Sequence, residues 1–271
     1  MIKYVKGDFF NKIKQIKDKS VNLFLIDPPW AMNYDRWDVK KNNFEKFHSL
    51  WIKAIIHKMT DDGTAWIFMG KDFLFANKNK KIKNGLINIL EEYGNVNMDN
   101  WATWCRQKGR GSKHKLKSVR EEIIHFTKSN KYIWNEVKMK REVIIPYVKE
   151  GRPRGWILDQ STGKRIRWTG LGNVWFYNSP FWKGLLDKQR HSAQKPFLLY
   201  ERLILLSSNI GDLIVDPFAG SGASCIVSKY LKRNYIGIEK DVNIYNNNKL
   251  FIKNNYYKII DEYNKYKKLA I

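Results

Sequence analysis

Two short motifs place polar, glycine and aromatic residues at the ends of apolar runs. The first is Asp27-Pro28-Pro29-Trp30, which follows the apolar run 21–26. Consecutive prolines fix φ and donate no N–H, so the carbonyls of Asp27 and Pro28 are held rigidly. With the Asp27 carboxylate they form a set of acceptors beside the flat indole of Trp30. This arrangement suits the exocyclic amino group of a nucleobase, because its two N–H groups meet acceptors while its ring stacks on Trp30.

The second motif is a glycine loop. Asp216-Pro217-Phe218-Ala219-Gly220-Ser221-Gly222 follows the apolar run 212–216 and opens a helical pattern. Glycines let a backbone approach a ligand closely, but a dinucleotide fingerprint needs a third glycine where Cys225 stands. Glu239 ends the next β-type run, where a carboxylate can accept from two ribose hydroxyls. The motif predicts a nucleoside-bearing cofactor without a pyrophosphate; a tight turn without a ligand is the alternative.

Elements that could position these motifs alternate along the chain. Alternating strands and helices indicate a mostly parallel sheet with helices on both faces. Such sheets bind ligands at the carboxyl ends of their strands, where Asp8, Asp27, Asp216 and Glu239 fall. The predicted strands are 2–5, 21–26, 64–69, 121–128, 212–216 and 234–239, and the predicted helices are 44–59, 196–208 and 222–232.

Charge points to a polyanionic partner. The 271 residues include 50 Lys and Arg against 26 Asp and Glu, a net charge of +24, and neutralising phosphates releases counterions. An AT-rich genome could inflate lysine, but arginines gather in the middle third. The stretch at about 135–175 is dense in Gly, Pro, Arg and Trp without a helical period, so we expect an irregular insertion that recognises nucleic acid; a plain basic loop is the alternative. The candidate contacts are Arg106, Lys108, Arg110, Arg152, Arg154, Arg165 and Arg167.

Composition excludes several classes of protein. Hydrophobic residues make up 43% and aromatic residues 14%, too much for a disordered chain. No apolar run approaches the roughly 18–20 residues of a membrane span, and the N-terminus lacks a secretory pattern. Cys105 and Cys225 cannot form a disulfide framework or a four-cysteine zinc site, and the histidines lack ligand spacing, so we assign no metal. We expect a soluble, reduced, cytoplasmic protein.

Taken together, the two motifs resemble those of the S-adenosylmethionine-dependent DNA amino-methyltransferases. Because Asp27-Pro28-Pro29-Trp30 precedes the glycine loop, the order is similar to that of the circularly permuted beta group. The resemblance implies a Rossmann-like sheet of seven strands, one of them antiparallel. It divides the chain into a catalytic half at 1–134, a target-recognition insertion at 135–180, and a cofactor-binding half at 181–271 that completes the same α/β domain. Segments 6–8, 20–23, 104–111, 126–129, 173–175 and 191–196 also resemble the group.

The resemblance also implies a reaction and roles for single residues. A methyl group would pass from S-adenosylmethionine to the N6 amino group of a flipped adenine, with Asp27, Pro28, Pro29 and Trp30 as catalytic residues. Lys195 and His191 would lie near the cofactor's carboxylate, although His191 could instead cap or pack. The remaining cofactor residues would be Asp8 beside its adenine, Glu239 at its ribose, Gly220, Ser221 and Gly222 against its methionine part, and Asp216 and Phe218 in the same loop.

Three alternatives stay open. The group more often has tyrosine at the position of Trp30, and tryptophan there resembles the RNA adenine methyltransferases. N4-cytosine methylation is the second, although serine more commonly replaces Asp27 in such enzymes. A basic nucleic-acid-binding module without activity is the third. The expected partner is double-stranded DNA, and a homodimer and a cognate restriction endonuclease are left open.

Overall fold

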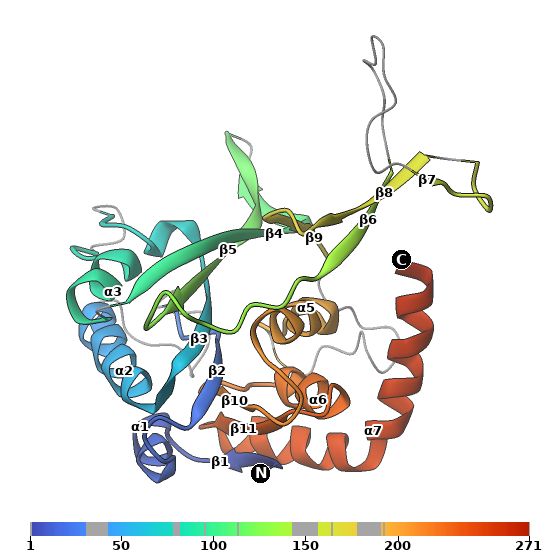
Figure 1. Ribbon diagram of the computed structural model, residues 1–271. Helices are drawn as coiled ribbons and strands as arrows, with labels where there is room; N and C mark the ends of the chain where they lie inside the picture. The colour runs from blue at the N-terminus through green and yellow to red at the C-terminus, as the bar shows by residue number, and fades with distance from the viewer. Residues whose placement is uncertain are drawn as a thin grey trace.

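The computed structural model describes residues 2–30, 43–77, 82–94, 96–112, 114–142, 157–163, 165–177, 191 and 193–270. Its centre is an eight-stranded sheet (Figure 1). In spatial order the strands are β1 (Ile2–Lys6), β11 (Asn234–Glu239), β10 (Leu213–Asp216), β2 (Val21–Ile26), β3 (Met59–Met69), β5 (Lys115–Thr127), β4 (Asn97–Ser112) and β9 (Val174–Phe176). The predicted α/β class is therefore confirmed, and strands from both ends of the chain share one sheet.

Only β5 reverses the direction of this sheet. It pairs antiparallel with β3 and with β4, whereas every other neighbouring pair is parallel. The single antiparallel strand matches the expectation, but the sheet has eight strands instead of seven. The additional strand is β9 at the edge, where Trp175 is buried while Val174 and Phe176 are exposed. Burial of that one indole favours the pairing of this short segment with β4.

Helices cover both faces of the sheet. Figure 1 shows α1 (Phe9–Lys12), α2 (Phe44–Lys58) and α3 (Leu86–Gly94) on one side and α5 (Phe197–Ser207), α6 (Ala223–Tyr230) and α7 (Val242–Ala270) on the other. Two separate apolar clusters fill the two interfaces. In α2 the buried Trp51, Ile52 and Ile55 recur at helical spacing, which is the pattern that predicted it. Within the described residues, none of the helices combines the length and apolar character that a membrane crossing requires.

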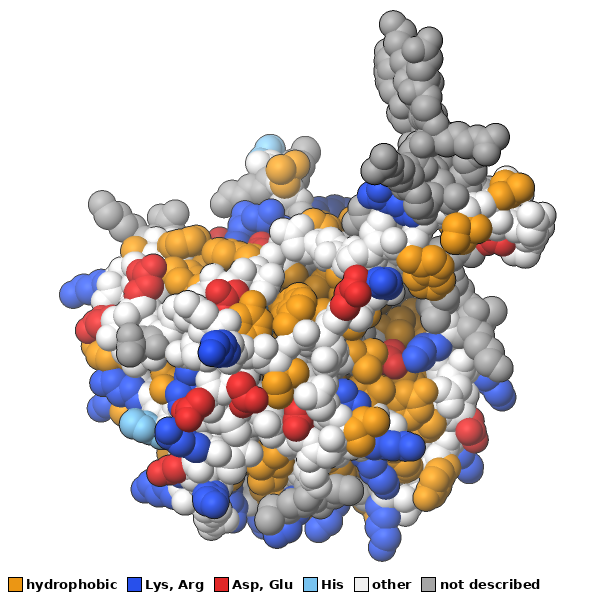
Figure 2. All heavy atoms as spheres, viewed as in Figure 1, with side chains coloured by type: hydrophobic (Ala, Val, Ile, Leu, Met, Phe, Trp, Pro, Cys, Tyr) orange, Lys and Arg blue, Asp and Glu red, His pale blue; other side chains and the backbone are white. Residues whose placement is uncertain are grey.

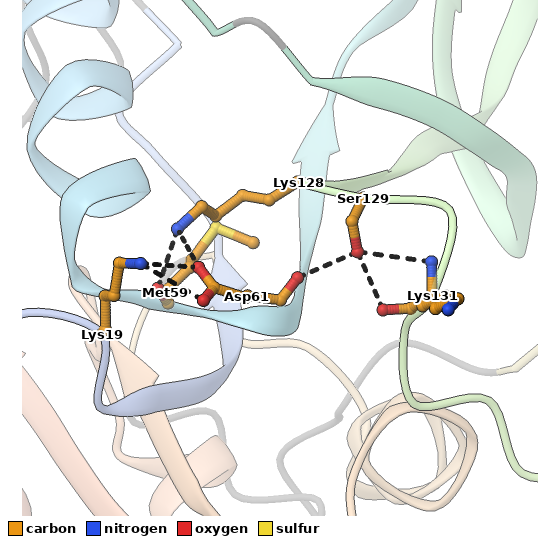
Figure 3. Close-up of polar contacts among 6 residues, drawn as sticks. All are labelled: Lys19, Met59, Asp61, Lys128, Ser129 and Lys131. Atoms are coloured by element: carbon orange, nitrogen blue, oxygen red, sulfur yellow. Dashed lines mark hydrogen bonds and ion pairs between the residues drawn. The ribbon is translucent and has the colours of Figure 1, made fainter.

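Polar contacts join strands at the edge of the sheet where β2 and β3 begin. Asp61 pairs there with Lys19 at 3.1 Å and with Lys128 at 3.5 Å (Figure 3). The Ser129 hydroxyl donates to the Asp61 carbonyl at 2.9 Å. The Asp61 side chain is 73% exposed, so these pairs contribute little to stability. They orient the start of β3, which begins at Met59 instead of at the predicted residue 64.

The middle of the chain forms a second, smaller sheet, so the expectation of an irregular insertion was wrong. Strands β6 (Lys138–Glu142), β8 (Arg165–Gly170) and β7 (Ile157–Leu158) pair antiparallel in that order. In β8 Ile166 is buried, whereas Arg167 and Trp168 are both exposed. The burial of β8 therefore does not alternate, and pairing with β6 and β7 defines these strands. This sheet extends away from the main one (Figure 1).

Candidate active site

Neighbouring strand ends gather four carboxylates at one edge of the main sheet. Asp27 follows β2, Asp216 ends β10, Glu239 ends β11 and Asp8 comes shortly after β1. The strand register pairs Lys6 with Glu239 and Asp216 with Gly237, so these ends lie level. This is the arrangement that the sequence predicted. Among the described residues, no three His, Cys, Asp or Glu side chains form a group that could hold a metal ion.

The glycine loop is tied to three other parts of the chain at Gly220. Its N–H donates to Glu239 Oε2 at 2.9 Å, and its carbonyl accepts from the Tyr4 hydroxyl at 2.7 Å. A Cβ on Gly220 would lie 3.2 Å from the His191 ring, and its φ of +48° favours glycine. Gly222, with φ +71°, is the N-cap of α6. The loop is thus fixed to β1 and β11, and the absence of a side chain at Gly220 makes room for His191.

Glu239 has the environment expected of a ribose acceptor. It is 7% exposed, and its second oxygen accepts from the N–H of Asp241 at 2.6 Å. Burial raises the pKa of Glu239, while its backbone hydrogen bonds act in the opposite direction. An ionised carboxylate has about four acceptor positions, so the bonds from Gly220 and Asp241, one at each oxygen, do not use up its capacity to accept. These residues fit a nucleoside-bearing cofactor.

The other acidic residues of this edge support the loop or its margin. Asp216 is buried and accepts from the hydroxyl of Ser224 and the N–H of Phe218. Burial raises the pKa of Asp216 to about 7. Asp8 caps α1 by accepting from the N–H of Phe10 at 2.9 Å, and it pairs with Lys240 at 3.0 Å. Asp216 therefore fixes the glycine loop to the start of α6, while Asp8 caps α1 at the same edge of the sheet.

Lys195 lies beside the proline motif. Its ammonium donates to Asp27 Oδ2 at 2.5 Å and lies 3.3 Å from Glu121 Oε2. The Lys195 side chain is only 3% exposed. The position of Lys195 near the cofactor's carboxylate, which the resemblance implies, stays a prediction; in the structure its ammonium contacts two carboxylates of the protein. Glu121 lies in β5, and sequence reasoning assigned it no function, although an acidic pair opening an apolar strand was a usable signal.

These charges set the protonation of the site. Burial raises the pKa of Asp27 to about 6, although the attraction of Lys195 lowers it. Burial also works to lower the pKa of Lys195, but Asp27 and Glu121 outweigh it and leave that pKa raised. Asp27 is therefore ionised at neutral pH beside a charged lysine. It can accept hydrogen bonds.

Trp30 packs near this pair. A Cβ on Gly70 would meet its ring at 3.1 Å, and the Lys195 ammonium lies 5.5 Å from its centroid. His48 was also missed by sequence reasoning. It is fully buried, and its Nδ1 accepts from the Trp51 indole at 2.9 Å. Burial lowers the pKa of His48 to about 3, against a smaller raising effect of the Pro29 backbone, so a neutral histidine packs against the motif.

The candidate nucleic-acid contacts divide into three groups. Arg106 pairs with the buried Glu121 at 3.0 Å and is directed into the protein. Arg167 is exposed in β8, and the strand register pairs it with Arg141. Arg152 and Arg154, and the side chains of Lys108, Arg110 and Arg165, lie outside the described residues.

A mostly parallel sheet with one reversed strand, a glycine loop after one strand and an Asp-Pro-Pro-Trp motif after its neighbour together define a methyltransferase of the α/β class. The family model described as "DNA methylase", which covers N6 and N4 enzymes, matches residues 21–253. The chain belongs to this family. It is also 32% identical, over 255 residues, to the Type II methyltransferase M1.MboII of Moraxella bovis, covering 88% of this chain and 91% of that protein.

Two solved structures share the fold. The structure of M1.HpyAVI in complex with SAM has a TM-score of 0.61 at 22% identity, covering 93% of this chain and 99% of that one. The PvuII DNA methyltransferase, described as cytosine-N4-specific, has a TM-score of 0.67 at 17% identity, covering 97% of this chain and 91% of that one. Because the fold is shared with an N4 enzyme, it does not by itself identify the target base.

Proposed function

We propose that the protein methylates the N6 amino group of adenine in double-stranded DNA after the base has left the helix stack. The observation that carries this proposal is Asp27, an ionised carboxylate on a rigid double-proline loop, held by Lys195 at the carboxyl end of β2. The aspartate at the first position of the motif favours adenine over cytosine. The Type II designation of M1.MboII supports a restriction–modification setting, in which a cognate endonuclease and a homodimer are further proposed partners.

The residues of the motif would act on a weak nucleophile. The amino lone pair of adenine is delocalised into the ring, so it must be drawn out of conjugation before it can attack. Asp27 and the Pro28 carbonyl would accept hydrogen bonds from its two N–H groups, and Pro29 would keep that carbonyl fixed. Trp30 would stack on the extruded base, which offsets a few kcal/mol of lost stacking. Much of the acceleration would then come from orientation.

The cofactor is S-adenosylmethionine, which supplies an electrophilic methyl group on its sulfonium. We propose that Glu239 accepts from its ribose hydroxyls. Gly220, Ser221 and Gly222 would lie against its methionine part, and the helix α6 that begins behind them favours the negative carboxylate. His191 would close the loop from the side, consistent with its contact to Gly220.

The product of the reaction tests this proposal. Purified protein, S-adenosylmethionine with a labelled methyl group and unmodified duplex DNA should give N6-methyladenine when the DNA is digested to nucleosides. The same sequence offered as RNA should remain unlabelled. N4-methylcytosine would overturn the assignment of the base, and label in RNA alone would overturn that of the substrate. Cofactor binding without any methylated product would favour a binding module without activity.

We further propose that the segment 135–180 recognises DNA, and its arginines test this. Substitution of Arg152, Arg154, Arg165 and Arg167 singly by alanine should separate two roles. Loss of a phosphate contact should weaken binding to all sequences and flatten the salt dependence, whereas loss of a base contact should cost about 1–3 kcal/mol on the preferred site alone. Affinities for cognate and scrambled duplexes at two salt concentrations give the answer.

Lys131→Ala is a suitable control for these substitutions. Lys131 is exposed and lies near the Asp61 contacts, at the edge of the sheet where β3 begins (Figure 3). Lys131→Ala should change neither the affinity for DNA nor the dependence of that affinity on salt concentration. Basic side chains are distributed over the visible face of the molecule (Figure 2), so a general charge effect would appear in this control as well. Four arginine variants with unchanged affinity and salt slope would place recognition elsewhere.

A further inference from the structure

We infer that Glu121 is a positioning residue for the methyl transfer and that it acts on Asp27 through Lys195. The inference rests on the proposed role of Asp27. Four charged groups form a continuous line: Arg106 lies 3.0 Å from Glu121, Glu121 lies 3.3 Å from Lys195, and Lys195 lies 2.5 Å from Asp27. The line links β4 and β5 to the catalytic motif.

Lys195 is held between its two carboxylates. The Lys195 ammonium donates hydrogen bonds to Asp27 and to the Ala193 carbonyl at 3.4 Å, and it forms an ion pair with Glu121 on its other side. The rings of Phe68 and Trp30 lie 5.4 Å and 5.5 Å from the ammonium. Without Glu121 the flexible lysine stem would lose one of the contacts that restrict its direction, and Asp27 would be paired with a less restricted ammonium.

Stability alone accounts poorly for this line of charges. Taking ions out of water costs several kcal/mol each, and well-packed apolar residues often stabilise such a position better. Here the Glu121 and Lys195 side chains are 8% and 3% exposed, and Lys195 contacts the carboxylate of Asp27, which is proposed to face the target amino group. A buried arrangement that holds Asp27 in one orientation accounts for both observations.

Because Glu121 and Lys195 carry opposite charges, their substitutions should shift the pH dependence of activity in opposite directions. The groups that act on Asp27 are Lys195, Glu121 and Trp30, and Asp216 and Tyr200 are coupled to it as well. Protonation of Asp27 removes its charge and turns one of its acceptor oxygens into a donor, so activity should fall as pH falls through its pKa of about 6. Glu121 raises the pKa of Asp27 and Lys195 lowers it. Glu121→Gln should therefore move the acid limb to lower pH, whereas Lys195→Met should move it to higher pH.

Glu122→Gln provides a matched control. Glu122 is the next residue of β5 and is equally buried, at 4% against 6% for Glu121. Because side chains alternate along a strand, it faces the other side of the sheet, where it accepts from Trp101 at 2.9 Å and from Thr103 at 2.8 Å. The Glu122→Gln substitution therefore removes one negative charge from the same strand without removing a contact of Lys195.

The experiment measures kcat, KM and the pH profile of the full-length protein, with the cofactor affinity by calorimetry. We expect Glu121→Gln to lower kcat at least about tenfold, with a shifted acid limb and a cofactor Kd within about twofold of wild type. Glu122→Gln should keep kcat within about threefold and leave the limb in place. Wild-type kcat and an unmoved limb in Glu121→Gln, or equal losses in both variants, would overturn the inference.

Two further measurements keep the test decisive. If Glu121→Gln does not fold, Glu121→Asp keeps the charge on a shorter side chain, and it should lower kcat without moving the limb; wild-type kcat there would also overturn the inference. The identity of the methylated base is read separately from the wild-type product. Methylation of cytosine would correct the proposed function, and the variants would still decide whether Glu121 acts through Lys195.

Discussion

Asp27→Asn should lower methyl transfer by at least about a hundredfold while the affinity for S-adenosylmethionine stays within a few fold. The amide keeps the size of the side chain but removes the charge that draws out the adenine lone pair, and positioned groups of this kind contribute about 10²–10⁴-fold. The amide also places an NH2 donor where one Asp27 oxygen accepts, so a single oxygen is left to accept from Lys195 and from the target amino group. Cofactor binding depends on the glycine loop and Glu239 instead.

Single-turnover methyl incorporation and calorimetry separate these two effects. Asp61→Asn is the control, because Asp61 is 73% exposed at the edge of the sheet where β3 begins, and it should leave both quantities unchanged. A hundredfold loss corresponds to about 2.7 kcal/mol of barrier. Turnover of Asp27→Asn above about a tenth of wild type would contradict the assigned role.

Glu239→Ala should weaken S-adenosylmethionine binding by about 10- to 150-fold. Hydrogen bonds to a charged acceptor contribute about 1.5–3 kcal/mol, and two ribose hydroxyls would lose that acceptor. The substitution also frees the N–H of Gly220, which Glu239 holds at 2.9 Å, so the glycine loop loses one of its three ties. Glu239→Gln keeps one acceptor oxygen, so its affinity for S-adenosylmethionine should lie between those of Glu239→Ala and wild type. At saturating cofactor, kcat should stay within a few fold of wild type.

Glu45→Ala is the matched control for this effect. Glu45 also accepts from two backbone N–H groups, those of Lys83 at 3.0 Å and Asn84 at 2.9 Å. It lies in the first turn of α2, however, and these hydrogen bonds join it to the segment before α3 instead of to the glycine loop. Calorimetry should show an unchanged Kd for this variant. The same Kd in Glu239→Ala as in wild type would show that Glu239 is not a ribose acceptor.

Local sequence determined the elements of the main sheet and the positions of its ligand-binding ends. The apolar runs before Asp27, Asp216 and Glu239 each form a strand, because a buried parallel strand needs only a short continuous apolar segment. Once these strands are parallel neighbours, their carboxyl ends must meet at one edge, so the candidate carboxylates come together. Glycine at 220 and 222 permits the positive φ that the structure has there.

Only the tertiary structure decided which charges meet. Lys195 lies 168 residues from Asp27 in the chain, and nothing in its local sequence distinguishes a partner of Asp27 from a partner of the cofactor. The same holds for Arg106, which composition grouped with the surface arginines and the fold pairs with Glu121. Helical and strand periods are properties of neighbouring residues, whereas buried ion pairs form where assembled strands exclude water and leave each charge only the partners that packing brings within reach.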